Sequence, residues 1–385
     1  MTPLTDWIFG LLASVPAILR MAWDVKLSIE WRRRSVTASD GGPAEDRCAT
    51  LVLCTHNDLD ALRSIWPLWR GQRFPEGWQV QWVVVNDGST DGTREWLEGR
   101  CMANGKRLTV VHHDKQVAGK KAALAAGILA AEHDRLIFTD ADCIPSPDWA
   151  ANMAAGLGAP DAPPLVLLGF SLPAGGPAIL AFDALRIAWQ YGSEAAAGRP
   201  YMGVGRNLAY RKSHWLRTGG FNSHANLASG DDDLFVQDAI RSGATCVPVS
   251  APLEATCPTR PAVSLADGLQ RKRRHLSVVS HYGVGHRRRL LADAALDPAV
   301  AAAALAGAAG LLHSGGWIPA AAAGLALTLR AATLSTFARD LHQPRFAGIR
   351  ALWLGSVRWG LLGVATLSNF TSSPTWTQRA PTRRS

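Results

Sequence analysis

Two carboxylates end an apolar run in this chain, and their spacing suggests metal chemistry. The run is Leu136-Ile-Phe-Thr-Asp140-Ala-Asp142. If it is a β-strand, alternate side chains share a face, so Asp140 and Asp142 point the same way at its end. Carboxylate oxygens suit Mg²⁺ or Mn²⁺, above all where phosphates of a ligand complete the coordination shell. Because an Asp-x-Asp pair also occurs in ordinary turns, the interpretation depends on other segments.

A second acidic segment, Val85-Asn-Asp87-Gly-Ser-Thr90-Asp91-Gly-Thr, follows another apolar run. Asp87 at the carboxyl end of a strand can accept hydrogen bonds from a base or a ribose. The alternative is an Asp-Gly turn before a helix capped by Thr90 or Asp91.

A third segment holds three adjacent acids, Asp231, Asp232 and Asp233. Neighbouring carboxylates repel one another, so the run needs a cation or a basic partner. Capping a helix N-terminus would need only one of them. This run therefore favours a functional role.

Alternating strands and helices must position these side chains. Continuous apolar runs indicate buried strands, and apolar residues at helical spacing indicate the helices between them. Strands are predicted at Thr50–Cys54, Val80–Val85, Leu108–His112 and Leu136–Thr139, and helices at Leu59–Trp69, Thr93–Arg100 and Lys120–Glu132. The pattern predicts a doubly wound α/β sheet with its ligand at the carboxyl ends of the strands.

Taken in order, the motifs of residues 49–290 resemble those of family-2 glycosyltransferases, which have the GT-A fold. The matching segments are 85–93, Gly119-Lys120-Lys121-Ala-Ala-Leu124, Asp140-Ala141-Asp142, Gly203-Val-Gly205-Arg-Asn207 with Gly219-Gly220-Phe221, and Ser229-Gly230-Asp231-Asp232-Asp233-Leu234. Two positions depart from the family pattern, with Asn86 in place of Asp and Gly230 in place of Glu. The resemblance implies a mixed sheet with a Rossmann-like nucleotide-binding half.

The resemblance also implies a role for each matching residue. The expected nucleotide-sugar site comprises Thr55, Asn57, Asp58, Asp87, Lys120 and Asp140, and the expected metal ligands are Asp142 and Asp140. Lys120 would meet a phosphate at a helix N-terminus, although a solvated lysine pair is the alternative. Asp231 is the expected general base, with Asp232 as the second choice. Asn207 would shape the floor beneath the sugar on the acceptor side.

The segment Gln270-Arg271-Lys272-Arg273-Arg274-His275 resembles the Gln-x-x-Arg-Trp motif of membrane-associated family members. Gln270 and Arg273 match and would close over the diphosphate or the acceptor. Arg274 stands where the family has Trp, which weighs against processive polymer synthesis. A basic helix contacting lipid headgroups is an equal interpretation, and the two are compatible.

Composition favours a membrane partner over a nucleic acid. The chain has 385 residues, 48% of them hydrophobic, and a formal net charge of +9. Its basic clusters lie beside apolar stretches or at the tail, as expected for binding to anionic lipid, and no nucleic-acid-binding motif is evident. Six cysteines without a Cys-x-x-Cys pair make zinc improbable and favour a reducing compartment.

The predicted organisation has a catalytic centre between apolar ends. The parts are an N-terminal membrane or interfacial helix (1–34), a linker (35–48), a GT-A catalytic domain (49–262), basic interfacial helices (263–290), C-terminal transmembrane helices (291–370) and a disordered tail (371–385). A span and an interfacial helix remain open for residues 3–23, while a cleaved signal peptide is disfavoured because no basic region precedes the apolar core. Segments 299–313, 317–328 and 351–368 are candidate membrane helices, with Ala-rich soluble helices as the alternative.

These observations predict a membrane-anchored, inverting, Mg²⁺- or Mn²⁺-dependent glycosyltransferase. It would move a sugar from a nucleotide diphosphate donor, expected to be a UDP-sugar, to a hydroxyl of a lipid or lipid-linked acceptor. The basic residues after the first helix place the catalytic domain in the cytoplasm at the inner membrane. The alternatives are a processive polysaccharide synthase and an inactive sugar-nucleotide-binding membrane scaffold.

Overall fold

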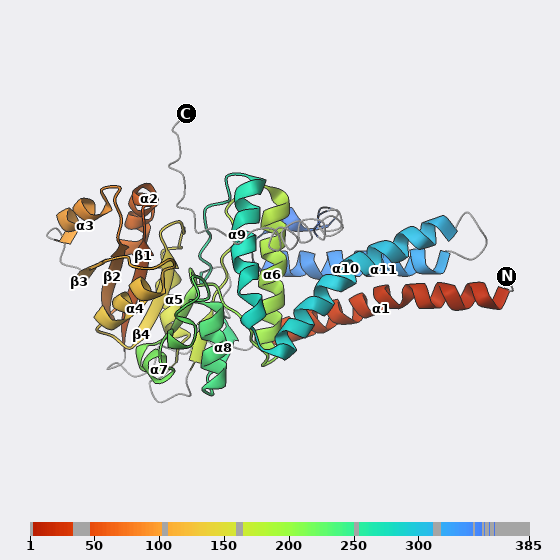
Figure 1. Cartoon of the computed structure of the whole chain (residues 1–385), viewed down its shortest axis with the longest axis horizontal. Coiled ribbons are helices and arrows are strands. Elements are labelled where there is room, and N and C mark those ends of the chain that lie inside the picture. The colour runs from red at the N-terminus through yellow and green to blue at the C-terminus, as the bar shows by residue number, and fades with distance from the viewer. Residues whose placement is uncertain are drawn as a thin grey trace.

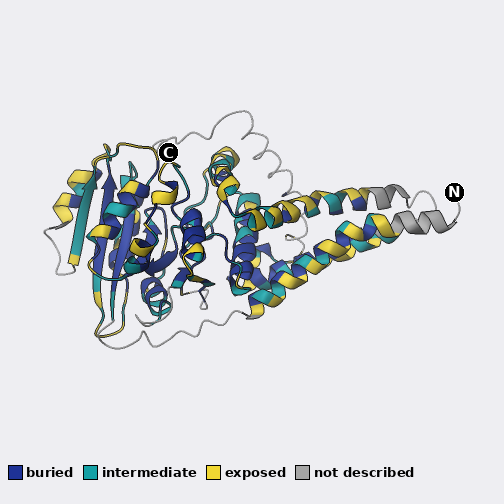
Figure 2. Ribbon diagram, turned by 60° about the horizontal axis from the view of Figure 1, so that its bottom comes forward, coloured by how far each residue is buried: buried dark blue, intermediate teal, exposed yellow. Residues whose placement is uncertain are grey.

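The computed structural model shows a mixed α/β head from which three long helices project (Figure 1). It describes residues 3–33, 47–101, 107–158, 165–249, 254–310, 317–341, 343–348, 350, 354 and 358. Figure 2 shows the sheet as the most deeply buried part of the head, whereas the projecting helices keep exposed faces along their length.

A seven-stranded sheet forms the head, in the order β3-β2-β1-β4-β6-β5-β7. Its strands are β1 (Cys48–Thr55), β2 (Gln79–Asp87), β3 (Arg107–His113), β4 (Arg135–Asp140), β5 (Leu165–Leu168), β6 (Leu208–Arg211) and β7 (Thr245–Pro248). The first four are parallel, β6 runs antiparallel to both β4 and β5, and β7 is parallel to β5. The chain thus reverses its strand order at β1 and β4, where ligands of open α/β sheets bind.

Apolar residues explain why the central strands are buried on both faces. Leu51, Val52 and Leu53 of β1 and Val83 to Val85 of β2 have no exposed surface. The helices of the head are α2 (Leu59–Arg70), α3 (Thr93–Cys101), α4 (Lys121–Ala130), α5 (Trp149–Ala155), α6 (Ala178–Ala196), α7 (Lys212–Arg217), α8 (Asp233–Arg241) and α9 (Leu265–Ser277). Gly127 of α4 allows that helix to lie directly on the sheet, because a Cβ there would approach Val85 to 2.6 Å.

Three helices form the stalk: α1 (Pro3–Arg33), α10 (Val284–Gly310) and α11 (Trp317–Asp340). They pack against one another, and α6 joins them to the head (Figure 1). Of the described helices, only one segment, Ala320–Asp340 in α11, is long and apolar enough by length and composition to cross a membrane.

Ion pairs fill the junction of the stalk with the head. This joint network consists of Arg20 and Asp24 of α1, Asp183 and Arg186 of α6, Lys272 of α9, Asp293 and Asp297 of α10, Arg330 of α11, and Arg358. All nine side chains are buried. Because unpaired buried charges are strongly destabilising, the mutual pairing fixes how these helices meet.

The sequence predicts the four parallel strands and the three helices between them with ends displaced by at most two residues. Two expectations differ from the structure. β4 ends at Asp140, so Asp142 lies in the following turn and the alternating geometry of a strand does not apply to it. α10 begins at Val284 and crosses the predicted boundary at 290 as one helix. The predicted linker (35–48) and tail (371–385) and the segment 351–368 lie largely or wholly outside the described residues.

Candidate active site

The carboxyl ends of β1, β2, β3 and β4 bring the predicted residues to one edge of the sheet. The strand register pairs Thr55 with Asn86, Cys54 with Asp140, and Asp87 with His113. Since all four strands are parallel, their last residues meet at this edge without any further folding requirement. The predicted site is therefore assembled by the sheet itself.

The loops after β1 and β2 are tied together by side-chain hydrogen bonds. Asn57 has a left-handed backbone, with φ of 49°. Its Oδ1 accepts a hydrogen bond of 2.7 Å from the Thr90 amide, and its own amide donates to Ser89 Oγ at 3.0 Å. Asp91 Oδ2 accepts from the Leu59 amide at 2.9 Å, next to Asp58. Asn57 and Asp58 are thus held beside the Asp87 loop, as the nucleotide-site prediction requires.

Asp87 is buried between two basic side chains. The Lys115 ammonium donates to Oδ2, and His113 Nδ1 lies 2.8 Å from Oδ1. Lys115 also donates to the carbonyl of Gly119 at 2.8 Å, which holds the loop before α4 against the end of β2. A base or ribose that reaches Asp87 would join a carboxylate already engaged by these two residues.

Lys120 and Lys121 are adjacent, but their side chains have different partners. Lys121 Nζ donates to the carbonyls of His224 and Leu227, at 2.6 and 2.9 Å, and so anchors that loop. Lys120 Nζ instead lies 3.1 Å from Asp140 Oδ1 and 2.9 Å from Asp231 Oδ2. The predicted metal ligand and the predicted base therefore face the same ammonium, which lies at the start of α4.

The acidic residues around Lys120 determine its charge state. Burial alone would lower the pKa of Lys120, but Asp140, Asp231 and Asp232 hold it well above its usual value. The side chain stays charged at physiological pH and keeps 27% of its surface exposed. A substrate anion can therefore reach it.

The three adjacent acids have separate partners. Asp232 is the N-cap of α8, where its Oδ1 accepts from the Asp233 amide, and its Oδ2 accepts from the Gly205 amide at 2.8 Å. Asp233 accepts a hydrogen bond of 2.5 Å from the Tyr282 hydroxyl. Burial and the Asp232 carboxylate raise the pKa of Asp233 well above its usual value, although Tyr282 opposes them.

Of the three, Asp231 is the one directed at Lys120. Gly205 packs directly against this pair, since a Cβ there would lie 3.3 Å from both Asp231 Oδ2 and Lys120 Nζ. The capping role of Asp232 and the Tyr282 bond of Asp233 distinguish these two residues from Asp231, which the sequence predicts as the base.

Asp142 lies in the turn after β4 and is 8% exposed. Its carbonyl accepts hydrogen bonds from the Arg260 amide at 2.8 Å and from Thr259 Oγ1 at 3.4 Å. These bonds attach the turn to the segment before α9. Asp142 and Asp140 remain close in the chain, but a turn rather than a strand sets their relative orientation.

Asn207 serves the scaffold of the site. It is fully buried, its Nδ2 donates to the carbonyls of Phe170 and Ala255, and its Oδ1 accepts from Trp149 Nε1. The side chain thus supports the floor from below, and these bonds give no direct contact with an acceptor.

Gln270 and Arg273 lie on α9, which is fixed to α6 by the buried ion pair of Lys272 with Asp183. Burial and the nearby cations Arg274 and Arg206 lower the pKa of His275 on this helix, whereas Asp231 opposes them. The structure thus holds the Gln-x-x-Arg segment on a helix packed against α6.

Carboxylate oxygens are the available metal donors. In the described part of the chain, no group of three or more His, Cys, Asp or Glu side chains is arranged to hold a metal ion. Two carboxylates fit Mg²⁺ or Mn²⁺ where substrate phosphates and water supply the remaining ligands. Asp140 and Asp142 meet that requirement in chemistry, and no zinc-type donor set replaces them.

Sequence reasoning missed four residues of the site: His113, Lys115, Arg206 and Tyr282. His113 ends β3 and Lys115 follows it, both beside Asp87, and their basic character at a strand end was a usable signal. Arg206 lies between two motif residues, Gly205 and Asn207, and was passed over for that reason. Tyr282 offers no local signal, because it is 49 positions from Asp233.

Comparison with known proteins supports the fold, and part of the chain matches a known family. Residues 50–162 match the family described as Glycosyl transferase family 2. PcManGT, a mannosyltransferase from Pyrobaculum calidifontis solved with GDP-Man and Mn²⁺, has a TM-score of 0.56 at 18% identity, covering 93% of this chain and 99% of its own. TarS 1-349 from S. aureus has a TM-score of 0.41 at 15% identity, covering 82% and 91%. No curated protein sequence matches significantly. At 18% identity the first structure supports the mixed-sheet GT-A fold.

Proposed function

We propose that this chain, whose residues 50–162 match the family-2 glycosyltransferases, moves a sugar from a nucleotide diphosphate donor to a hydroxyl of a lipid or lipid-linked acceptor, with inversion at the anomeric carbon. UDP- and GDP-sugars are the donors to test, with a UDP-sugar expected first.

One observation carries the proposal. Lys120 Nζ bridges Asp140 at 3.1 Å and Asp231 at 2.9 Å. These residues come from the end of β4, the start of α4 and the segment before α8, and they converge although up to 111 positions separate Lys120 from Asp231. A donor site and a base that share one ammonium group is the geometry that transfer to a hydroxyl needs.

In the proposed reaction, Asp231 accepts the proton of the acceptor hydroxyl as its oxygen attacks the anomeric carbon. The new C–O bond forms on the face opposite the diphosphate. The bond from the anomeric carbon to the β-phosphate oxygen breaks, and its electron pair leaves with the nucleotide diphosphate. Lys120 holds positive charge beside the reacting groups and donates to a phosphate oxygen.

Asp140 and Asp142 would hold the divalent cation together with the donor phosphates. When bound, Mg²⁺ or Mn²⁺ supplies electrostatic stabilisation of the leaving diphosphate. The loops of Thr55, Asn57, Asp58 and Asp87 would hold the nucleoside, since they form the neighbouring edge of the sheet.

We further propose that the stalk attaches the enzyme to a membrane and that the acceptor comes from it. On α1, the exposed side chains Leu11, Leu12, Val15, Ile18 and Leu19 fall on one helical face, while Ser14, Ala17 and Arg20 are buried on the other. Exposed apolar stripes of this kind mark interaction surfaces. The apolar segment Ala320–Asp340 and the basic run Arg287 to Arg289 support a bilayer as the partner. On the charge asymmetry, the head would lie in the cytoplasm at the inner membrane.

A donor screen tests the proposed function. Detergent-purified full chain with Mn²⁺ or Mg²⁺ is incubated with UDP- and GDP-sugars and total membrane lipid extract, while nucleotide diphosphate release and lipid mass are followed. We expect metal-dependent release from one donor and a lipid heavier by one sugar. A ladder of additions would indicate a processive synthase instead, and no release from any donor would contradict the proposal.

Membrane attachment is tested separately by flotation of the full chain with vesicles containing anionic lipid. We expect co-flotation with the vesicles. Replacement of Leu12, Val15 and Leu19 by Ser should weaken it, whereas the exposed control Leu68→Ser on α2 should not. Equal flotation of all variants, or none of the native chain, would contradict the attachment.

A further inference from the structure

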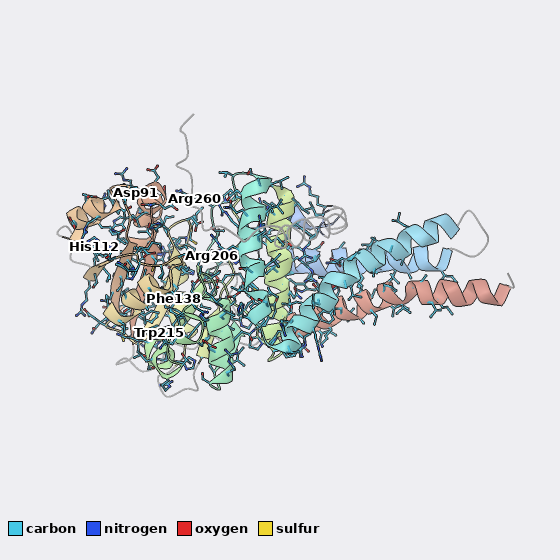
Figure 3. All side chains as sticks on the ribbon, viewed as in Figure 1. Asp91, His112, Phe138, Arg206, Trp215 and Arg260 are labelled. Atoms are coloured by element: carbon cyan, nitrogen blue, oxygen red, sulfur yellow. The ribbon has the colours of Figure 1, made fainter. Side chains whose placement is uncertain are left out.

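Arg206 is a cation of the site that the proposed reaction does not use. In Figure 3 it lies between the sheet and the helix pair α6 and α9. Its Nε donates to Ser171 Oγ at 2.8 Å, and Ser171 in turn donates to the carbonyl of Cys257 at 2.6 Å. The inner edge of the guanidinium is thus fixed to a segment that follows β5.

The backbone that carries Arg206 is held on both sides. The Gly205 amide donates to Asp232 Oδ2 at 2.8 Å, and the Asn207 amide donates to the carbonyl of Val204 at 2.8 Å. Asn207 is fully buried and bonded through its side chain to three other segments. Consecutive residues are therefore anchored, which gives the arginine a set direction before any ligand arrives.

The outer edge of the guanidinium remains available. Among the described residues, Nη1 and Nη2 of Arg206 make no hydrogen bond, and neither is enclosed as a buried unpaired atom. Although burial opposes them, Cys143, Asp142, Asp140 and Asp232 raise the pKa of Arg206 above its usual value. The guanidinium with its free edge therefore lies near the acids of the site.

We propose that Arg206 binds an oxyanion of a substrate, a phosphate or a carboxylate, through its two free NH₂ groups. The inference rests on the proposed function, because it takes a substrate anion to occupy the same acidic site. An arginine anchored through Nε and open at Nη1 and Nη2 presents two parallel donors, which match the paired oxygens of such a group.

Two substrates could supply this anion, since both can carry a phosphate next to the transferred sugar. One is the diphosphate of the donor. The other is an anionic group on the acceptor, such as the phosphate of a phospholipid. Lys120 presents a single ammonium close to Gly205, since a Cβ on that glycine would lie 3.3 Å from its Nζ. Lys120 and Arg206 would thus together bind a multiply charged anion, which the carboxylates alone would repel.

Calorimetry on the full chain tests the inference without turnover. With Mn²⁺ present, UDP, GDP and inorganic pyrophosphate are titrated into the native chain and into Arg206→Gln, with uridine and guanosine as phosphate-free probes. Arg107→Gln at the start of β3, at the opposite end of the parallel strands from the site, removes the same charge from an exposed side chain and serves as the matched control. Kinetics with phosphatidic acid and with diacylglycerol as competing lipids test the acceptor side.

If the donor supplies the anion, Arg206→Gln weakens diphosphate and pyrophosphate binding about 10- to 100-fold, as expected for a charged hydrogen-bonding group, and leaves nucleoside binding unchanged. If the acceptor supplies the anion, Arg206→Gln leaves diphosphate binding unchanged. In the native chain phosphatidic acid then inhibits transfer more strongly than diacylglycerol does, and this difference is lost in the variant. Unchanged binding and unchanged lipid inhibition would overturn the inference.

Two further variants keep the test valid if Arg206→Gln does not fold. Arg206→Lys keeps the charge without the two parallel NH₂ donors, so it should recover only part of the affinity for the anion. Ser171→Ala releases the anchored edge and should weaken the same ligand about 3- to 10-fold, near the range of one neutral hydrogen bond. Native affinity in both would contradict the inference. A native chain that binds UDP through Arg206 but transfers no sugar would contradict the proposed reaction and not this subsite.

Discussion

Two groups of acidic residues in this molecule differ in the number and the burial of their basic partners. In the joint network, Asp24, Asp183, Asp293 and Asp297 meet Arg20, Arg186, Lys272, Arg330 and Arg358, and every member is buried. In the active site, Asp140, Asp142, Asp231 and Asp232 lie near Lys120 and Arg206, which are partly exposed, while Asp233 accepts a hydrogen bond from Tyr282.

This difference in basic partners separates the acids that stabilise the fold from the acids that serve the reaction. A buried charge must be paired within the protein, so the joint has matched its acids with bases. The active site has an excess of acid beside solvent, and that excess is compensated when a cation binds. The comparison predicts that changes in the joint alter stability first and that changes in the site alter activity first.

The largest expected effect is on activity, from Asp231→Asn. The amide cannot accept the proton of the acceptor hydroxyl, so the rate of transfer should fall by about 10²- to 10⁴-fold. The melting temperature should stay near that of the native chain. Initial rates of nucleotide diphosphate release with the best donor measure the effect. Asp60→Asn, 68% exposed on α2, is the control and should retain the native rate.

If Asp231→Asn keeps the native rate of transfer and Asp232→Asn lowers it, Asp232 is the base. If neither change lowers the rate, the assignment of the site is wrong.

The next effect is on stability, from Asp183→Asn at the joint. The change leaves Lys272 and Arg358 buried without their carboxylate, so the free energy of unfolding should fall by about 3–5 kcal/mol. Chemical denaturation in detergent measures the change. The exposed pair of Arg73 with Asp148 gives the matched control, and Asp148→Asn should lower the free energy of unfolding far less, because solvent screens that pair.

Equal stability of Asp183→Asn and Asp148→Asn would break the comparison. Loss of nucleotide binding in a folded Asp183→Asn protein would also contradict it, because the joint would then belong to the site.

Acid should weaken the joint in a defined window. Although burial opposes them, Lys272 and Arg358 lower the pKa of Asp183 from its usual value to about 2. A lowered carboxylate pKa stabilises the folded state above the unfolded value, and this contribution of about 2 kcal/mol is lost as the pH falls from about 4 to about 2. Unfolding measured between pH 5 and pH 2 should show this fall in the native chain.

The same titration on Asp183→Asn serves as the control and should lack that component. An identical pH dependence in both proteins would show that Asp183 is not the group responsible.

The smallest expected effect comes from Tyr282→Phe, which removes one hydrogen bond to Asp233. The free energy of unfolding should fall by about 1–3 kcal/mol, because Asp233 is left buried with one partner fewer. Donor binding should be retained, since Asp233 supports α8 rather than the substrate. A loss of donor affinity greater than the loss of stability would instead place Asp233 among the binding residues.

The sequence predicts the parallel half of the sheet because its strands are continuous apolar runs. β5, β6 and β7 have four residues each and were not predicted, since so short a run carries little periodicity. Asp140, Lys120 and Asp231 were found because they lie in motifs. The bonds of Lys115 with Asp87 and Tyr282 with Asp233 depend on how distant segments meet, and no local pattern encodes that.

The turn at Asp142 has the same explanation. The strand argument assumed that extended backbone continues beyond Asp140, whereas the Arg260 amide and Thr259 bond the carbonyl of Asp142 and turn the chain. The joint network was also missed. Its charged residues occur one at a time in apolar helices. Nothing in the local sequence shows that each of them pairs with a charge on another helix.

The most direct test of the account measures free Mn²⁺ by electron paramagnetic resonance during titration of the full chain. Two carboxylates, Asp140 and Asp142, cannot fill the shell of the ion alone, so we predict tight binding only when UDP or GDP is present. Asp140→Asn and Asp142→Asn should each abolish this nucleotide-dependent binding. Tight Mn²⁺ binding without nucleotide, or unchanged binding in both variants, would contradict the claim that the acidic excess of the site holds a cation together with the donor.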